Sequence, residues 1–379
     1  MQIAGGGRRR GATADFGRVP PPHSPPMLLR AASWSAAAAC RLRACASSPA
    51  RLPFSSAPPS PGDDLKACVA VVQRDAPLAY HAILALPAGD ARECAFAVQA
   101  LVEETGRAAE AGGSSSSGEG LALARLGWWA SAVDSAMASN RDRGHAALPA
   151  SPYVRALALA AQKGRLSRRW AARVVEARVR DVENGVGRRG PVHVGELEQL
   201  GDDVHGSALL LTLQGAGVAS VAADHAASHV GKATGACLAL RHLVRHGARR
   251  RTYVPRTVLA RNGLTQEALF RAAHAVAAGD ARGMESAEFK GSREKVAACA
   301  SELALVAREH LEHAKAIRSK ASKADLPQAA LAPLFPAALL EVYLDALEAD
   351  GWDALRPIAV SPAANAWALL RAWGKGSAW

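Results

Sequence analysis

Aromatic residues make up only 5% of the 379 residues, and the six cysteines form no CxxC pair. The shortage of Phe, Tyr and Trp disfavours a β-sandwich or a β-barrel, because strands favour aromatic and β-branched side chains. Isolated cysteines exclude a structural zinc finger and a disulfide framework. We therefore expect buried free thiols in a reducing compartment. The cysteines stand at positions 40, 45, 68, 94, 237 and 299.

Several common active-site motifs are absent as well. The chain contains no GxGxxG that opens a helix after a strand, no P-loop, no GxSxG and no HExxH. These absences exclude Rossmann-type dinucleotide sites, P-loop NTPases, α/β-hydrolases and HExxH metalloproteases. The net charge of +12 suggests nucleic-acid binding at first sight, but residues 1–62 hold eight arginines and one acid, and therefore +7 of it. We expect no nucleic-acid partner, because the folded part carries mixed charges.

Residues 1–62 have the composition of an organelle transit peptide. They are rich in Arg, Ser and Ala, nearly free of acids, and interrupted by prolines. The apolar stretch 27–40 contains Arg30, Ser33 and Ser35, which does not fit a secretory signal. We predict a disordered mitochondrial transit peptide. Import into a plastid is the alternative, and a disordered tail without a targeting role is the third interpretation.

The remaining chain, residues 63–379, is predicted to form one helical domain. Apolar residues recur at a spacing of three to four, and Pro and Gly fall between the periodic stretches. A Ser/Gly-rich flexible insert is expected near 112–120. The uncharged stretch 206–223 indicates two short buried helices that meet at a turn, so no transmembrane helix is expected. The predicted helices are 91–107, 121–139, 152–164, 167–184, 224–246, 265–278, 292–321 and 327–350. The fold class is therefore all-α.

Pairs of histidines were natural candidates for metal ligands. His310 and His313 are three residues apart, but no second motif completes a site, so an ordinary solvated helix face is favoured. His225 and His229 are four residues apart and are interpreted as helix histidines beside a packed interface.

Pairs of acidic residues do not indicate a metal site either. Glu103-Glu104 and Asp202-Asp203 are adjacent, and neighbouring side chains on a helix point about 100° apart. Neither pair is expected to converge on one ion. We predict no metal site in this chain, and no cofactor.

The segment 223–255 is distinctive. It reads Ala223-Asp-His-Ala-Ala-Ser-His-Val-Gly-Lys-Ala-Thr-Gly235, then Arg241, then Arg249-Arg-Arg-Thr-Tyr-Val-Pro255. It resembles the squalene/phytoene synthase superfamily around its second metal-binding helix. More closely, it is similar to the branch that contains the NADH dehydrogenase (complex I) assembly factor 6 proteins. Stretches 79–87, 95–104 and 169–183 extend the likeness to about 66–350. The signature residues are Asp224, His225, His229, Gly231, Gly235 and Pro255.

The resemblance implies an isoprenoid-synthase-like fold, an antiparallel helix bundle around a central cavity. Active members join two prenyl diphosphates, and two aspartate clusters hold Mg²⁺ against the diphosphate. The first cluster should fall at Gln99–Glu103, where apolar residues occupy the Asp-Asp step. The second should follow Arg241, but no acid occurs between Asp224 and Glu267. Basic residues there invert the local field, so Mg²⁺-dependent ionisation of a diphosphate is not expected.

The basic residues of this segment leave two interpretations open. They could line a cavity that binds an anion, such as a diphosphate, a lipid headgroup or a nucleotide. They could instead form a solvated face or a docking patch for an acidic partner. The candidates are Lys232, Arg241, Arg245, Arg249, Arg250, Arg251 and Tyr253.

The resemblance implies a non-catalytic role in assembly of mitochondrial respiratory complex I. Complex I assembly intermediates or other assembly factors would be the partners, on the matrix side of the inner membrane. The alternatives are a prenyltransferase and a protein that binds a prenyl lipid or quinone. The C-terminal stretch 366–373 is short, aromatic and basic, and is expected either to contact the membrane peripherally or to pack on the bundle.

Overall fold

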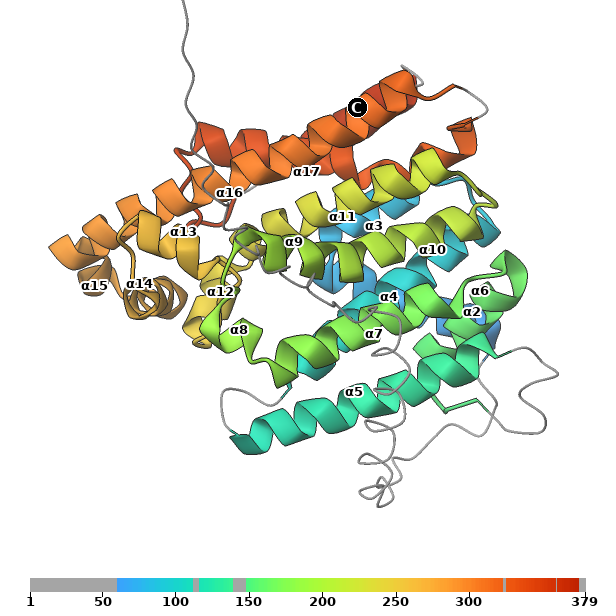
Figure 1. The fold of residues 1–379 in the computed structure, drawn as a ribbon, viewed down its shortest axis with the longest axis horizontal. Coiled ribbons are helices and arrows are strands. Elements are labelled where there is room, and N and C mark those ends of the chain that lie inside the picture. The colour runs from blue at the N-terminus through green and yellow to red at the C-terminus, as the bar shows by residue number, and fades with distance from the viewer. Residues whose placement is uncertain (1–59, 112–115, 139–147, 323–324, 359, 375–379) are drawn as a thin grey trace, which may run out of the picture. The chain divides into compact units, whose positions relative to one another are not determined.

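The computed structural model describes residues 60–111, 116–138, 148–322, 325–358 and 360–374. Within these ranges the chain is helical and has no strand, which confirms the all-α prediction (Figure 1). The α-helices of the first half are α2 (Pro61–Asp75), α3 (Pro77–Leu84), α4 (Asp90–Glu110), α5 (Ser116–Met137), α6 (Pro152–Gly164), α7 (Arg168–Glu183), α8 (Val186–Arg189) and α9 (Val194–Gly201). A π-helical turn, η3 (Asp202–Gly206), joins α9 directly to α10 (Ser207–Gly215).

The second half begins with α11 (Val221–Arg241), which is followed by α12 (Leu243–Ala248). It continues with α13 (Arg256–Arg261), α14 (Gln266–Ala278), α15 (Ala281–Glu285), α16 (Ala287–Lys320), the short 3₁₀ turns η4 (Gln328–Ala330) and η5 (Ala332–Leu334), α17 (Pro336–Ala349) and α18 (Pro362–Gly374).

The helix boundaries differ from the predictions at several ends, and α16, for example, begins five residues before the predicted start at Ser292. Helix α5 begins at Ser116, inside the predicted insert, whose residues 112–115 lie outside the described ranges. The predicted helix 224–246 is divided at His242 into α11 and α12. The predicted helix 327–350 becomes η4, η5 and α17, because Pro333 and Pro336 cannot continue a helix from the preceding turn. The predicted transit peptide lies outside the described residues up to residue 59, and α2 already includes Pro61 and Gly62.

The core consists of two groups of buried apolar side chains. The first joins α2, α4, α5, α6 and α7, and the second joins α11, α14, α16 and α17. Helix α10 contributes to both, with Leu211 in the first group and Leu213 in the second. The four cysteines at 68, 94, 237 and 299 are free and buried, as predicted, and Cys40 and Cys45 lie outside the described residues. Burial raises the pKa of the Cys94 and Cys237 thiols to about 12, so these thiols are not reactive.

Helix α11 is the central element, with α16 and α17 on one side and α9, η3 and α10 on the other (Figure 1). Two of the signature glycines allow this packing. A Cβ atom on Gly231 would lie 2.5 Å from Gly206 Cα, and one on Gly235 would lie 2.8 Å from Gly201 Cα. Larger residues would therefore push α11 away from α9 and η3. The π-helical turn η3 occurs at this crossing, and such turns often mark functional sites.

Among the described residues, one segment has the length and apolarity of a membrane span. It is Gln328–Ala349, with 22 residues and a mean hydropathy of 1.5. Sequence reasoning did not single it out. Of its most apolar window, 67% is buried, since η4, η5 and α17 form part of the core. A buried core helix passes the same test, so this is weak evidence for a membrane span. The stretch 206–223 forms one short helix, α10, then the predicted turn and the start of the long helix α11, so the second short buried helix that we predicted is not present.

Candidate functional site

The principal cavity has a volume of about 380 Å³ and is lined mainly by α3, α4, α9, η3, α10, α11, α12 and α17, with Arg178 from α7. Apolar side chains from seven positions form much of its lining: Ile83, Leu86, Val102, Leu197, Leu209, Leu238 and Leu340. A second set, which we call the polar cluster, consists of Gln99, Glu103, Arg178, His205, Arg241 and His242. Arg178 lies close enough to Glu103 and His205 to influence the pKa values of both. A cavity of this kind suits a ligand with an apolar tail and a polar head.

The two histidines of the polar cluster are uncharged near neutral pH. Burial, followed by the charge of Arg178, lowers the pKa of His205 to about 3. Burial, followed by the charge of Arg245, lowers the pKa of His242 to about 3 as well. The positive charge of the polar cluster is therefore carried by arginines.

Arg178 and Arg241 have no ion-pair partner among the described residues. The Nε atom of Arg178 is buried without a hydrogen-bond partner there. The guanidinium of Arg241 lies over the ring of Tyr343, 5.8 Å from its centroid. Burial raises the pKa of Glu103, which weakens the one carboxylate of the polar cluster as a counterion. The cluster therefore favours an anionic group.

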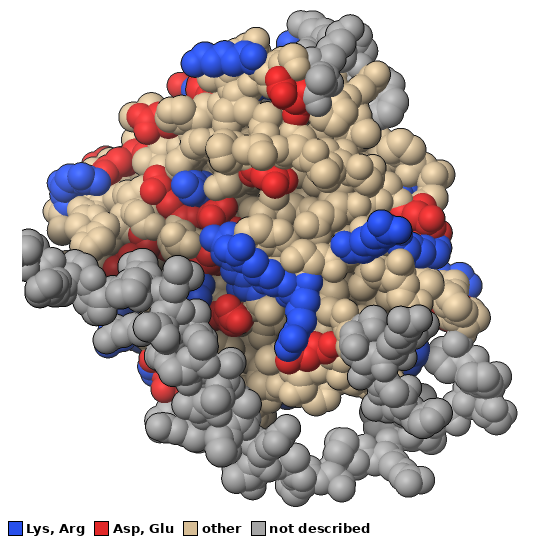
Figure 2. Space-filling model, turned by 45° about the vertical axis from the view of Figure 1, so that its right-hand side comes forward, with Lys and Arg blue, Asp and Glu red and all other residues tan. Residues whose placement is uncertain are grey.

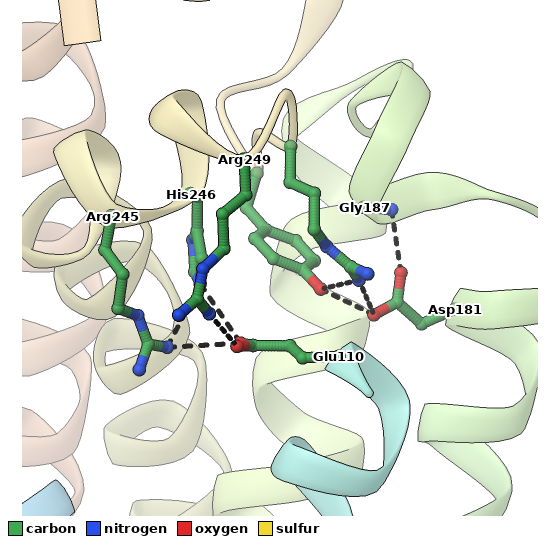
Figure 3. Close-up of polar contacts among 8 residues, drawn as sticks. Glu110, Asp181, Gly187, Arg245, His246 and Arg249 are labelled. Carbon is green, nitrogen blue, oxygen red and sulfur yellow. Dashed lines mark hydrogen bonds and ion pairs between the residues drawn. The ribbon is translucent and has the colours of Figure 1, made fainter. Parts of the chain in front are cut away.

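Glu110, at the end of α4, neutralises a different group of basic residues. Arg245 and Arg249 donate to its carboxylate at 3.1 and 3.0 Å, and His246 Nε2 lies 3.5 Å away (Figure 3). Burial alone would raise the pKa of Glu110, but His246 and Arg245 outweigh this and lower it to about 2. Arg245 and Arg249 therefore line the cavity as members of an ion-paired network.

Asp181 on α7 anchors the following part of the chain. Tyr253 Oη donates to its Oδ2 atom at 2.6 Å, the Gly187 N–H donates to Oδ1 at 2.8 Å, and Arg251 Nη2 lies 3.9 Å from Oδ2 (Figure 3). Burial, together with the charge of Asp181, raises the pKa of Tyr253 well above its usual range. Asp181 thus fixes the loop that connects α12 to α13.

The structure divides the predicted anion-binding residues among four places. Arg241, Arg245, Arg249 and Tyr253 line the cavity. Arg251 is buried beside Asp181, and Arg250 pairs with Glu267 at 2.7 Å outside the cavity. Lys232 does not line the cavity and lies near His229 instead. Sequence reasoning missed Arg178, His205 and His242, since no local pattern marks them as cavity residues.

The cavity lining does not fit the Mg²⁺ ions that the resemblance implies. Mg²⁺ requires several oxygen ligands, usually carboxylates and phosphates. Three carboxylates line the cavity, and two of them, Asp75 and Glu110, are held by arginines. The third, Glu103, accepts a hydrogen bond from Gln99 at 2.8 Å. The segment after Arg241 adds no acid, so the expected second cluster has no counterpart.

The other signature residues are distributed along α11 and the loop that follows α12. Asp224 and His225 are exposed in the first turn of α11, and Pro255 precedes α13 as its buried N-cap residue. His229 lies half-buried against α16. The glycines form the close contacts described above.

Two predictions about paired side chains need correction. Asp202 and Asp203 do converge on one cation, because Arg173 Nη2 lies 2.7 and 2.6 Å from their carboxylates. The π-helical turn changes the angle between neighbouring side chains from that of a regular α-helix. His310 and His313 do not form an ordinary solvated face, because both lie against His229 of α11.

Many of the charged side chains outside the cavity form ion pairs within the described part of the chain. On the face shown in Figure 2, basic side chains form a connected group near the middle and a second group beside it, and acidic side chains lie next to both. Arg308, for example, reaches both Asp345 and Glu348, and Arg271 reaches Glu288 at 2.6 Å. Paired charges of this kind do not form the continuous basic stripe that binds a phosphate backbone.

An all-helical domain around a mainly apolar cavity has the architecture of the isoprenoid-synthase fold. Solved structures share this fold. A dehydrosqualene synthase superposes with a TM-score of 0.60 at 16% identity, over 83% of this chain and 97% of the other. A squalene synthase from Alicyclobacillus acidocaldarius has a TM-score of 0.56 at 17% identity, over 79% and 98%.

The sequence comparisons identify the family. The model of the squalene/phytoene synthase family matches residues 73–364, so the chain belongs to this family. It is 28% identical to NADH dehydrogenase (ubiquinone) complex I, assembly factor 6 of Bos taurus, over 73% of this chain and 72% of that protein. The same protein of Mus musculus is 28% identical over 80% and 79%. The Dictyostelium discoideum homolog is 30% identical over 68% and 62%.

Proposed function

We propose that this protein assists the assembly of mitochondrial complex I and that its cavity binds an anionic amphiphile without turning it over. The proposal is supported by relatives named as complex I assembly factor 6, which are 28–30% identical over most of the chain. The observation that carries the non-catalytic part is the state of the cavity carboxylates, two of which are held by arginines.

Ionisation of a diphosphate requires a metal or an equivalent charge to stabilise the leaving group. Glu103 is the one cavity carboxylate without an arginine partner among the described residues. A single buried carboxylate cannot replace two facing clusters. Arg178 and Arg241 can bind an anionic head, but they do not supply the Mg²⁺ ions used by active members of the family.

The ligand that best suits the cavity is a prenyl lipid. The apolar lining accommodates a chain of isoprenoid units, and the polar cluster accommodates a phosphate or another anionic head. Retention of such a lipid would couple the factor to the membrane in which complex I is built.

We propose further that the protein is imported into mitochondria and contacts the matrix side of the inner membrane peripherally. Helix α18 packs on α17 and α3, while Trp367 and Leu370 on this helix are 63% and 64% exposed. Exposed apolar residues on a basic helix suit an anionic lipid surface. A fluorescent protein fused behind residues 1–62 should enter mitochondria; entry into plastids would support the alternative location.

The assembly role is tested by deleting the gene and restoring variants of the full chain. Wild-type protein and the surface control Arg168→Gln should restore complex I, while Arg178→Gln combined with Arg241→Gln should restore it poorly. Complex I abundance and prenyl-lipid levels are measured separately. Normal complex I in the deletion strain would contradict the assembly role. Full restoration of complex I by the double variant would agree with the assembly role but would contradict the role of the cavity.

The alternative function is a prenyltransferase, favoured by the shared fold with the two synthases. The purified chain is incubated with Mg²⁺ and farnesyl or geranylgeranyl diphosphate, and released diphosphate is measured. We expect no release above that of a heat-treated sample. Release at enzyme-like rates, lost in Arg178→Gln, would establish the alternative.

A further inference from the structure

Three histidines from two helices meet at the interface of α11 and α16, outside the lining of the cavity. They are His229 of α11 and His310 and His313 of α16, and one ring nitrogen of each lies within 4.8 Å of the others. The Nδ1 atoms of His229 and His310 are 3.0 Å apart, and the rings of His229 and His313 are stacked at 5.1 Å. Helices α11 and α16 run side by side here (Figure 1).

The surroundings of His310 orient its ring. Its Nε2 atom lies 3.1 Å from Oε1 of Glu198 on α9, so an Nε2–H group donates to this carboxylate. The other nitrogen, Nδ1, then carries the lone pair and points towards His229. A histidine held by a carboxylate through one nitrogen, with the other nitrogen free, is the usual arrangement of a metal-binding imidazole.

The charges around the three histidines have opposite effects on cation binding. Glu198 brings a negative charge to the site, whereas Lys232 lies near His229 and opposes a cation. Three neutral imidazoles are sufficient ligands for zinc, which commonly keeps a fourth position for water or an external ligand. His313 is exposed, so an ion can enter from solvent.

The distances between the histidine nitrogens need only a small change to suit a zinc ion. At zinc–nitrogen bonds of roughly 2.0 Å, tetrahedral ligands lie roughly 3.3 Å apart. The His229–His310 separation of 3.0 Å is already near this value. The exposed side chain of His313 can rotate towards the pair, because its spacing of three residues from His310 places both on one face of α16.

We propose that His229, His310 and His313 form a three-histidine site for Zn²⁺, with Glu198 as the positioning residue and an open fourth position towards solvent. The ion would join α11 to α16 and, through Glu198, to α9. The open position allows a partner protein to complete the site with one side chain. This proposal does not depend on what occupies the cavity.

The test uses the full chain without a histidine tag, stripped of metal with a chelator. Zn²⁺ is added, excess ion is removed by dialysis, and bound zinc is measured, with the visible absorption of bound Co²⁺ as a second readout. We expect one ion per chain. His313→Gln is the decisive variant, since this exposed side chain is not needed for folding, and it should weaken zinc binding by more than about tenfold.

Glu198→Gln should weaken binding by about tenfold to 100-fold, because it removes the carboxylate that orients His310. His274→Gln, an exposed histidine on α14, is the matched control and should bind as the wild type does. Circular dichroism confirms that each variant is folded. No zinc retained by the wild type, or equal retention by His313→Gln, would overturn the proposal and leave a hydrogen-bonded histidine pair with an adventitious ion only.

Discussion

Helix α11 contributes to two regions that contain the same residue type in opposite surroundings. Its C-terminal end, with Arg241 and the following His242, belongs to the polar cluster, where arginines surround the histidines. Its middle carries His229, which meets two histidines of α16 and lies near the carboxylate that holds His310. The first region therefore favours anions, whereas we propose that the second binds a cation. The role of a histidine in this protein is decided by its neighbours across the helix interface.

Gly231→Ala should have the largest effect, because it disturbs both regions together. The added methyl group would lie 2.5 Å from Gly206 Cα, and backbone atoms cannot move aside as a flexible side chain can. We expect a loss of about 3 kcal/mol in the free energy of unfolding, measured by urea denaturation. Gly195→Ala on α9 is the control, since its methyl group meets nothing within 4 Å and should be neutral or stabilising. Equal stability of the two variants would contradict the close packing.

Acid should destabilise both regions, because burial also lowers the pKa of His229, to about 4. The pKa values of His205 and His242 are about 3 in the folded protein, whereas an unfolded histidine has a pKa of about 6.5. Between these values the unfolded chain binds more protons, so stability falls as the pH drops below 6.5. From pH 7 to pH 5 each histidine contributes a loss of at most about 2 kcal/mol.

Glu103 acts in the opposite sense. Its raised pKa means that the folded protein takes up its proton more readily, which reduces the loss in acid. Urea unfolding at pH 7 and pH 5 measures the balance. His242→Gln should be less sensitive to acid than the wild type. An unchanged difference between the two pH values in this variant would show that His242 is not buried as a neutral group.

A change on α18 should leave both regions intact and alter membrane contact alone. Trp367→Ser combined with Leu370→Ser removes two exposed apolar side chains, which weakens binding to vesicles with anionic lipids by about tenfold or more. Leu305→Ser removes an exposed leucine from α16 and is the matched control. Co-sedimentation with vesicles measures the difference. If all variants sediment equally, α18 is not the membrane contact.

Glu110→Gln should have the smallest effect and would sharpen the contrast between the two regions. It releases Arg245 and Arg249 from their shared carboxylate, so the cavity becomes more positive. Affinity for geranylgeranyl diphosphate, measured by calorimetry with a chelator present, should rise about threefold to tenfold. Glu267→Gln releases the surface Arg250 and should change nothing. Weaker binding by Glu110→Gln would mean that this network shapes the cavity rather than competing with its ligand.

Much of the fold could be predicted from the sequence because helical periodicity is a local property. The apolar positions of α16, such as Val296, Cys299 and Leu303, recur at a spacing that marks one buried face. The absence of acidic residues after Arg241 could also be read directly from the sequence. The helix ends at His242 and before Pro336 were harder to predict, because tertiary packing decides whether a residue that disfavours a helix also ends it.

The site could be predicted only in part, because its contacts join distant residues. Arg245 and Glu110 are 135 positions apart, and Tyr253 and Asp181 are 72 apart. The sequence therefore indicated basic residues but not which of them a carboxylate already holds. His229 and His310 are separated by 81 positions, so considering histidine pairs within one helix overlooked the cluster.

The sequence by itself determined the helices, the glycines that let α11 pack closely, and the absence of acids where Mg²⁺ would bind, since these depend on residue type and local spacing. Only the tertiary structure decided which arginines face the cavity without a carboxylate partner and which histidines meet across α11 and α16. The physical reason is that charge pairing and ligand geometry act over a few ångströms in space. Such distances follow from the packing of whole helices, not from separation along the chain.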